Sequence, residues 1–393
     1  MNFATLSATV LILMATLFLA PCPVASSSVD SERITPVMLA VADAPVAFVG
    51  SDGRMHLVYE LWLKNFTSGK VAVEKVEVLG DGRVIATLDG AEIARRLQPA
   101  GLREPNAVMA ASTDALLFIH ITLPEGHAAP RTLTHRVQVR ADAAPPGMQD
   151  MSETGGEVTV DAQPVVVIGP PLRGDRYISA DSCCDASRHT RAALPVNGKV
   201  WIAQRYAVDW EQLDEQNRIY HGPATDVNSY TIYGKEILAV ADGKIASVTD
   251  GLPNQTPGQY PTNISLEQAD GNAVVQDLGG GHYALYAHFQ PHSIRVHTAD
   301  AVKRGQVLGL VGNSGNSVAP HLHFHVMNTP SALASSGLPY EIDRYRVIGK
   351  TPGTAAFDEA ESKGTPLAIT AISPPRQVTN GLPLDQLIIS LAP

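Results

Sequence analysis

The chain contains little cysteine and more negative than positive charge. Its 393 residues include three cysteines, and 29 Lys and Arg residues stand against 39 Asp and Glu residues, which gives a formal net charge of −10. A protein with this charge is poorly suited to binding a phosphate backbone, so we expect no nucleic acid partner. The length and the hydrophobic fraction of 45% are those of a globular protein with two or three domains.

No charged side chain precedes Asp30. An apolar segment at residues 8–25 ends in small residues, a pattern that predicts a secretory signal peptide over residues 1–26, cleaved near Ser26. Lys and Arg are absent before the apolar segment, and the alternative is an uncleaved N-terminal membrane anchor. With either outcome we expect a secreted or periplasmic protein of the cell envelope, with no membrane contact beyond this possible anchor.

The three cysteines assign no function by themselves. Cys22 lies in the predicted signal segment and follows a proline, where a lipoprotein signal has a small residue, so we expect no lipid anchor. Cys183 and Cys184 are adjacent, and a disulfide between neighbours would be strained. Free thiols and metal ligation are the alternatives for this pair.

Short runs of alternating apolar and polar residues recur between residues 34 and 142. We expect strands at residues 56–63, 71–78, 83–88, 115–123 and 133–139. This spacing predicts an immunoglobulin-like β-sandwich domain over residues 34–142. Its histidines are scattered, so we expect ordinary strand or loop residues: His56, His120, His127 and His135. The domain could be a spacer, or an adhesion or carbohydrate-binding module.

The rest of the chain also has mostly strand patterns. We expect residues 143–195 to be a linker or transition, residues 196–350 to form a second β domain, and residues 351–393 to be a C-terminal tail. Two long loops, 211–233 and 249–271, interrupt the second domain, and such loops often border a binding site. The predicted fold class is therefore all-β.

The most informative stretch is GNSGNSVAPHLHFHV at residues 312–326. Its first residues predict a tight turn. The following run alternates strictly, so a strand would place His321, His323 and His325 on one face. Successive imidazoles about 6.6 Å apart, at about 3.3 Å per residue, can converge on one metal ion, or one can bind metal while the next moves protons. A metal or catalytic site is favoured over a solvated strand face.

Four segments resemble, in order, the lysostaphin-type or LytM family of zinc metallopeptidases, which cut peptide bridges in bacterial cell walls. They are RYAVDW at 205–210, YGKEILAVADGKIASV at 233–248, YALYAHF at 283–289, and residues 302–326. The resemblance covers roughly residues 201–327. It implies an antiparallel β-sheet metallopeptidase domain and an enzyme, a zinc metalloendopeptidase that hydrolyses peptidoglycan peptides through a zinc-bound water.

Carried over by position, the resemblance implies that Asp209 and His323 bind Zn²⁺ and that His288 and His321 are the catalytic pair. Three protein ligands and one water would make an open catalytic zinc site. Zinc would lower the pKa of its water and polarise the scissile carbonyl. One histidine would take the proton of the water and the other would stabilise the oxyanion.

The sequence departs from this family at Arg205, where the family has its first zinc-binding histidine, four residues before Asp209. A guanidinium stays protonated and cannot bind zinc, and we expect it to pair with Asp209. A replacement ligand could come from His189, His221 or His325. The alternative is a catalytically degenerate family member that acts as a cell-wall binding or regulatory module.

Overall fold

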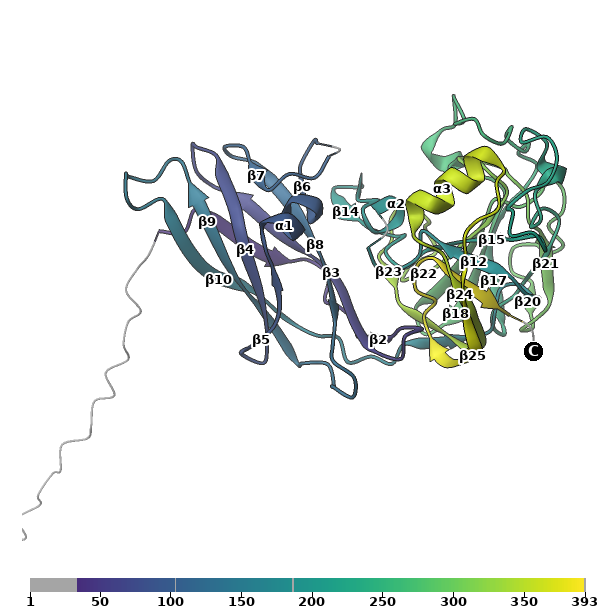
Figure 1. Cartoon of the computed structure of the whole chain (residues 1–393), viewed down its shortest axis with the longest axis horizontal. Helices are drawn as coiled ribbons and strands as arrows, with labels where there is room; N and C mark the ends of the chain where they lie inside the picture. Colours follow the sequence, from purple (N-terminus) through teal and green to yellow (C-terminus); the bar gives the residue numbers. More distant parts are fainter. Residues whose placement is uncertain (1–33, 103, 186, 392–393) are drawn as a thin grey trace, which may run out of the picture. The chain divides into compact units, whose positions relative to one another are not determined.

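The computed structural model describes residues 34–102, 104–185 and 187–391. The predicted signal peptide lies outside these residues. The described chain from Thr35 onward forms one compact unit, which is built almost entirely of strands (Figure 1). Among the described residues, no helix has both the length and the apolar character needed to cross a membrane.

The N-terminal part of this unit consists of two sheets that share one core. The first sheet has the order β1 (Val37–Val41), β3 (Met55–Asn65), β8 (Asp114–Thr122), β6 (Leu97–Pro99), with β2 (Phe48–Val49) paired to β3. The second has the order β10 (Asp150–Thr159), β9 (Thr132–Ala141), β4 (Val71–Gly80), β5 (Arg83–Leu88), with β7 (Val108–Met109) paired to β4. The short helix α1 (Gly90–Arg96) is capped by the carboxylate of Asp89, which accepts from two backbone amides.

Alternation explains how these sheets pack. On β3, Leu57, Leu61 and Leu63 are fully buried and share one cluster with Val73 of β4 and Val137 of β9. Inward-facing side chains of two sheets that fill one core make a β-sandwich. The strands expected from residue 56 to residue 139 are all present, and the predicted all-β fold class is confirmed. Strand β10 lies within the stretch expected to be a transition, where paired glycines interrupt the alternation.

A larger sheet carries the rest of the chain. Among the described residues its order is β11 (Val166–Ile168), β24 (Tyr340–Lys350), β26 (Leu387–Ser390), β12 (Tyr177–Ala180), β15 (Val208–Gln212), β22 (Leu322–Met327), β19 (His282–Ala287), β18 (Ala273–Gly279), β17 (Gly243–Thr249), β20 (Ala301–Val302). Strand β23 (Gly337–Leu338) pairs with β22, and β25 (Thr370–Gly381) pairs with β24. The β11–β24 pair is parallel.

Smaller elements surround this sheet. They are two strand pairs, β13 (Leu194–Val196) with β14 (Lys199–Trp201) and β16 (Glu236–Leu238) with β21 (Val307–Leu310), the 3₁₀ turns η1 (Val227–Ser229) and η2 (Leu266–Gln268), and the helices α2 (Ser187–Thr190) and α3 (Thr354–Lys363). Phe357 and Ala360 of α3 pack in one cluster with Ile178 of β12 and Ile388 of β26. The segment expected to be a tail therefore supplies two strands and a helix.

Strand β22 has one face in the core of the large sheet and carries histidines on the other face. Leu322, Phe324 and Val326 are fully buried in the main core, and the alternation of the strand turns the intervening histidines to the other face. Strand β22 lies between β15 and β19, and His323 pairs in register with Asp209 of β15 and Ala287 of β19. The register thus brings together residues that are far apart in sequence.

Candidate metal centre

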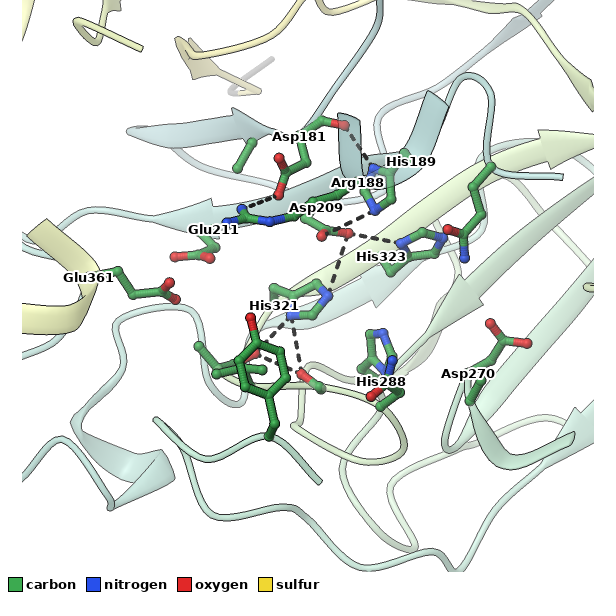
Figure 2. Close-up of a pocket in the computed structure, with 18 of the residues that line it drawn as sticks. Asp181, Arg188, His189, Asp209, Glu211, Asp270, His288, His321, His323 and Glu361 are labelled. Atoms are coloured by element: carbon green, nitrogen blue, oxygen red, sulfur yellow. Dashed lines mark hydrogen bonds and ion pairs between the residues drawn. The ribbon is translucent and has the colours of Figure 1, made fainter. Parts of the chain in front are cut away.

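Asp209 lies at the centre of a group of three imidazoles (Figure 2). Its Oδ1 atom is 2.8 Å from Nδ1 of His323 and 3.5 Å from Nε2 of His321, and its Oδ2 atom is 3.3 Å from Nε2 of His189. The ligand atoms of His189, Asp209 and His323 all lie within 4.8 Å of one another. Two imidazole nitrogens and one carboxylate at this spacing are a donor set for a single metal ion.

His189 comes from the short helix α2, before the strand that carries Asp209. Its Nδ1 atom lies 2.7 Å from the backbone oxygen of Asp181, to which it donates a hydrogen bond. This bond fixes the tautomer, so the lone pair of a neutral His189 is on Nε2, the nitrogen that faces Asp209. Of the three replacement ligands considered from the sequence, His189 is the one that reaches this group.

His325 lies behind His323 instead of joining the group. Its Nδ1 atom is 3.0 Å from Nε2 of His323, and its ring is fully buried. When His323 donates from Nε2 to His325, its own Nδ1 keeps a lone pair directed at Asp209. His325 is therefore placed to orient His323. The third candidate, His221, is exposed and belongs to none of the convergent groups among the described residues.

His288 and His321 lie side by side next to the group formed by His189, Asp209 and His323, with ring centroids 4.6 Å apart. Nδ1 of His288 donates to the backbone oxygen of Ser314 at 2.7 Å, and Nδ1 of His321 donates to that of Ala319 at 2.8 Å. Both bonds leave Nε2 as the nitrogen available for chemistry. The backbone of His288 has a φ of 66°, a left-handed conformation that is uncommon in residues other than glycine.

The loop that holds His288 depends on glycine. Gly315, with a φ of 77°, lies against Gly271, and a Cβ on Gly315 would be 2.3 Å from the backbone nitrogen of Gly271. Only glycine allows this approach. Ser314 Oγ accepts from the backbone of Asn272 at 2.8 Å and donates to the oxygen of Phe289 at 2.8 Å. The turn predicted at residue 312 thus positions the carbonyl that orients His288.

The charges in this group depend on one another. Burial favours the neutral acid at Asp209, but His189 and His321 outweigh it and lower the pKa of Asp209 well below its usual range. Burial lowers the pKa of His189, but Asp209 outweighs it and raises that pKa to about 9. Burial, with His321 and His323, lowers the pKa of His288 well below its usual value. A metal ion would take the place of the proton on His189.

Part of the chain is similar in sequence to known peptidases. The model of peptidase family M23 matches residues 224–335. The match covers less than half of the chain, so it shows that these residues resemble the family. Lysostaphin of Staphylococcus simulans is 30% identical over 128 residues, which are 33% of this chain and 23% of that protein. The glycyl-glycine endopeptidase ALE-1 of Staphylococcus capitis is 35% identical over 101 residues, 26% of this chain and 24% of that protein.

Solved structures of the same kind also match. The catalytic domain of lysostaphin is 23% identical, with a TM-score of 0.23 over 42% of this chain and 86% of that chain. A zinc-containing peptidase from Vibrio cholerae is 14% identical, with a TM-score of 0.25 over 73% of this chain and 81% of that chain. The chain spans about a quarter of the length of the curated relatives that it matches.

The M23 match begins after Asp209, so two of the three converging ligands lie before it. Within the match, His288, His321 and His323 also form a convergent group, with ligand atoms within 4.8 Å of one another. The four site residues predicted from the sequence are thus close together.

The prediction that Arg205 pairs with Asp209 is wrong. The Arg205 guanidinium lies 2.9 Å and 2.7 Å from the two carboxylate oxygens of Glu60 on β3, and 3.6 Å from a carboxylate oxygen of Asp43. Its Nη1 also donates to the backbone oxygen of Gly337 at 3.1 Å. Arg205 lies in a turn before β15, and the buried carboxylate of Glu60 needs a paired cation. Arg205 therefore joins the sandwich to the turn that precedes β15 of the large sheet.

Cys183 and Cys184 form a disulfide with each other. The disulfide excludes the two alternatives considered from the sequence, free thiols and metal ligation by these cysteines. The disulfide lies between Asp181 and Arg188 in the sequence, and Nη1 of Arg188 lies 2.7 Å from Oδ2 of Asp181. The segment that carries His189 is thus held by covalent and ionic contacts.

The site opens into a pocket of about 440 Å³. Besides Asp209 and the histidines, it is lined by charged side chains that the sequence patterns did not indicate: Asp181, Arg188, Glu211, Asp270 and Glu361. The predicted long loop at 249–271 contributes Tyr260 and Asp270 to this lining. The carboxylates come from separate elements, so no motif joins them in the sequence.

Proposed function

We propose that the protein is a zinc metalloendopeptidase that hydrolyses peptide bonds in bacterial peptidoglycan, acting outside the cytoplasm. The observation that carries this proposal is the convergence of His189, Asp209 and His323, because it supplies a full ligand set although Arg205 replaces the usual histidine. The M23 family match and the similarity to lysostaphin support the reaction class. The predicted signal peptide supports the location.

The donor set fits zinc. Two neutral imidazoles and one carboxylate leave a fourth position open in a tetrahedral site. The second nitrogen of each imidazole is already engaged, by the Asp181 carbonyl for His189 and by His325 for His323, as is usual for metal-binding histidines. Bound zinc would lower the pKa of a water and polarise the scissile carbonyl.

The two remaining imidazoles supply the proton chemistry. His288 donates from Nδ1 to the Ser314 carbonyl, so its Nε2 accepts the proton of the attacking water and later gives it to the leaving amine. Burial keeps His288 neutral, the form that a base requires. His321, when protonated on both nitrogens, donates from Nε2 to the oxyanion while Nδ1 stays on the Ala319 carbonyl.

The competing function is a cell-wall binding module without catalysis. This alternative was favoured by Arg205 alone, because a lost ligand suggested a decayed site. The position of His189 removes that reason, and the ion pair of Arg205 with Glu60 gives the arginine a separate structural role. We therefore favour the peptidase.

The test is hydrolysis of purified peptidoglycan by the full chain, measured as new amino groups released, with zinc content measured on the same samples. We expect about one zinc per chain and activity in the wild type. His321→Ala should keep zinc and lose activity by about 100-fold or more, whereas His323→Ala should lose both. Intact peptidoglycan after incubation with fully zinc-loaded protein would refute the proposal.

A further inference from the structure

The pocket contains a second group of charged side chains beside the metal-binding group. Glu211 follows Asp209 by two positions on β15, so both side chains lie on the same face of the strand. Glu361 reaches the pocket from α3, and Figure 2 shows its carboxylate facing that of Glu211. Neither residue takes part in the convergent metal-binding groups found among the described residues.

The nearby cation is already paired. Nη1 of Arg188 lies 2.7 Å from Oδ2 of Asp181, and its Nη2 lies 2.8 Å from Oδ2 of Asp358. In the described part of the chain, no ion pair is formed by Glu211 or by Glu361. Arg188 thus forms its ion pairs with Asp181 and Asp358, and it acts on Glu361 only through its charge, which lowers the pKa of Glu361 and opposes the effect of burial.

Glu211 is the more informative of the two. It is 5% exposed, and its buried Oε2 atom has no hydrogen-bond partner among the described residues. A buried carboxylate without a partner is costly, and two facing carboxylates cost more, unless a proton or a cation is placed between them. Burial, reinforced by Asp358, raises the pKa of Glu361 to about 7. Glu211 and Glu361 hydrogen-bond to each other through a shared proton, and a cation placed between them would take the place of that proton.

We propose that Glu211 and Glu361 form a subsite for a primary ammonium group of the peptide substrate. The inference rests on the proposed peptidase function and deepens it, because it selects substrates with a free amine close to the cleaved bond. An ammonium is compact and carries three N–H donors, which suits two facing carboxylates. A metal ion is disfavoured because only two carboxylates meet there.

The position of the subsite sets the distance of the amine from the cleaved bond. Asp209 and Glu211 are two residues apart on an extended strand, or about 6.6 Å at about 3.3 Å per residue. An extended peptide covers this distance in about two residues. The ammonium is therefore on the terminus or side chain of a residue within about two positions of the bond that is hydrolysed.

The test compares two peptides that differ only in whether this amine is free or acetylated. For the full-length zinc-loaded protein we expect kcat/KM to be about tenfold or more higher for the free amine, the range for hydrogen bonds between charged groups. Glu361→Gln keeps the shape and removes the carboxylate, so it should abolish this preference. Glu359→Gln, on the exposed face of the same helix, is the matched control and should keep the preference.

A binding measurement separates this proposal from the peptidase proposal. Calorimetry on the full chain, after removal of metal with a chelator, should show the free-amine peptide binding about tenfold more tightly than the acetylated one, and Glu361→Gln should equalise them. If the free-amine peptide binds more tightly but neither peptide is cleaved, the proposed peptidase function is refuted and the proposed subsite is not. Equal binding or equal cleavage of the two peptides would overturn the subsite, as would a second zinc per chain that Glu361→Gln removes.

Discussion

Nε2 of His189 lies 3.3 Å from Oδ2 of Asp209. The two residues belong to different elements, α2 and β15, and the nitrogen in question is the one left free by the bond from Nδ1 to a backbone carbonyl. A histidine that is buried, held in one tautomer and directed at a carboxylate is arranged as a metal ligand. We propose that His189 supplies the ligand that Arg205 cannot provide.

Replacing His189 tests this arrangement directly. We expect His189→Ala to bind zinc more than about 100-fold more weakly than the wild type, because loss of a ligand costs more than the 10–100-fold typical of a residue that only orients one. His221→Ala is the control, since that residue is exposed and lies outside the convergent groups among the described residues. Elemental analysis and competition with a chelator measure the effect. Equal zinc content in both variants would exclude His189 as a ligand.

His325 offers a second and separate prediction. His325→Phe removes the acceptor for Nε2 of His323, so the zinc affinity should fall by about 10–100-fold while the fold persists. His325→Glu supplies a carboxylate acceptor at the same place and should recover most of the affinity. Zinc titration of the three proteins decides the matter, and an unchanged affinity in His325→Phe would show that His323 needs no such support.

The sequence was sufficient for the residues that strand alternation brings together. Asp209 and His323 lie on neighbouring strands whose apolar faces are well marked by Trp210 and Phe324, and the register of β15 with β22 then pairs the two polar residues. His288 follows the end of β19, the next strand in the sheet. Strand alternation placed His321 and His323 on one face, whereas Asp209 and His288 were singled out by the resemblance to the family.

Other parts of the site have no such pattern. Helix α2 has four residues, too few for a helical period, so nothing in the sequence singled out His189 from His221. Strand β25 is mostly exposed, so its sequence lacks the apolar and polar alternation of a half-buried strand. The segment was therefore expected to be a tail, and the position of Glu361 in the pocket was not predicted. Arg205 pairs with Glu60 and not with Asp209. Glu60 is distant in the sequence, so no local pattern could have predicted this ion pair.

The ion pair between Arg205 and Glu60 should be important for stability. Arg205→Met leaves a buried carboxylate without a partner and should lower the free energy of unfolding by about 3–5 kcal/mol. The double variant Arg205→Met, Glu60→Leu removes both charges and should regain most of this loss. Arg140→Ala, which breaks an exposed ion pair with Asp150, should have little effect. Denaturant unfolding compares the four proteins, and a double variant that is no more stable than Arg205→Met alone would argue against a coupled pair.

A buried carboxyl in the sandwich predicts how stability depends on pH. Burial raises the pKa of Glu153 from its usual 4.5 to about 7, so between these values the folded protein holds a proton that the unfolded chain has lost. The contribution of Glu153 to the free energy of unfolding therefore decreases as the pH rises from about 4.5 to about 7. Glu153→Gln stays uncharged and should be more stable than the wild type at pH 8, by on the order of 2 kcal/mol, but nearly equal to it at pH 5. Glu157→Gln, exposed on the same strand, makes the same change in net charge and should show no such difference. Thermal unfolding at both pH values measures the effect, and a gain at pH 5 equal to that at pH 8 would show that the carboxyl of Glu153 does not titrate in this range.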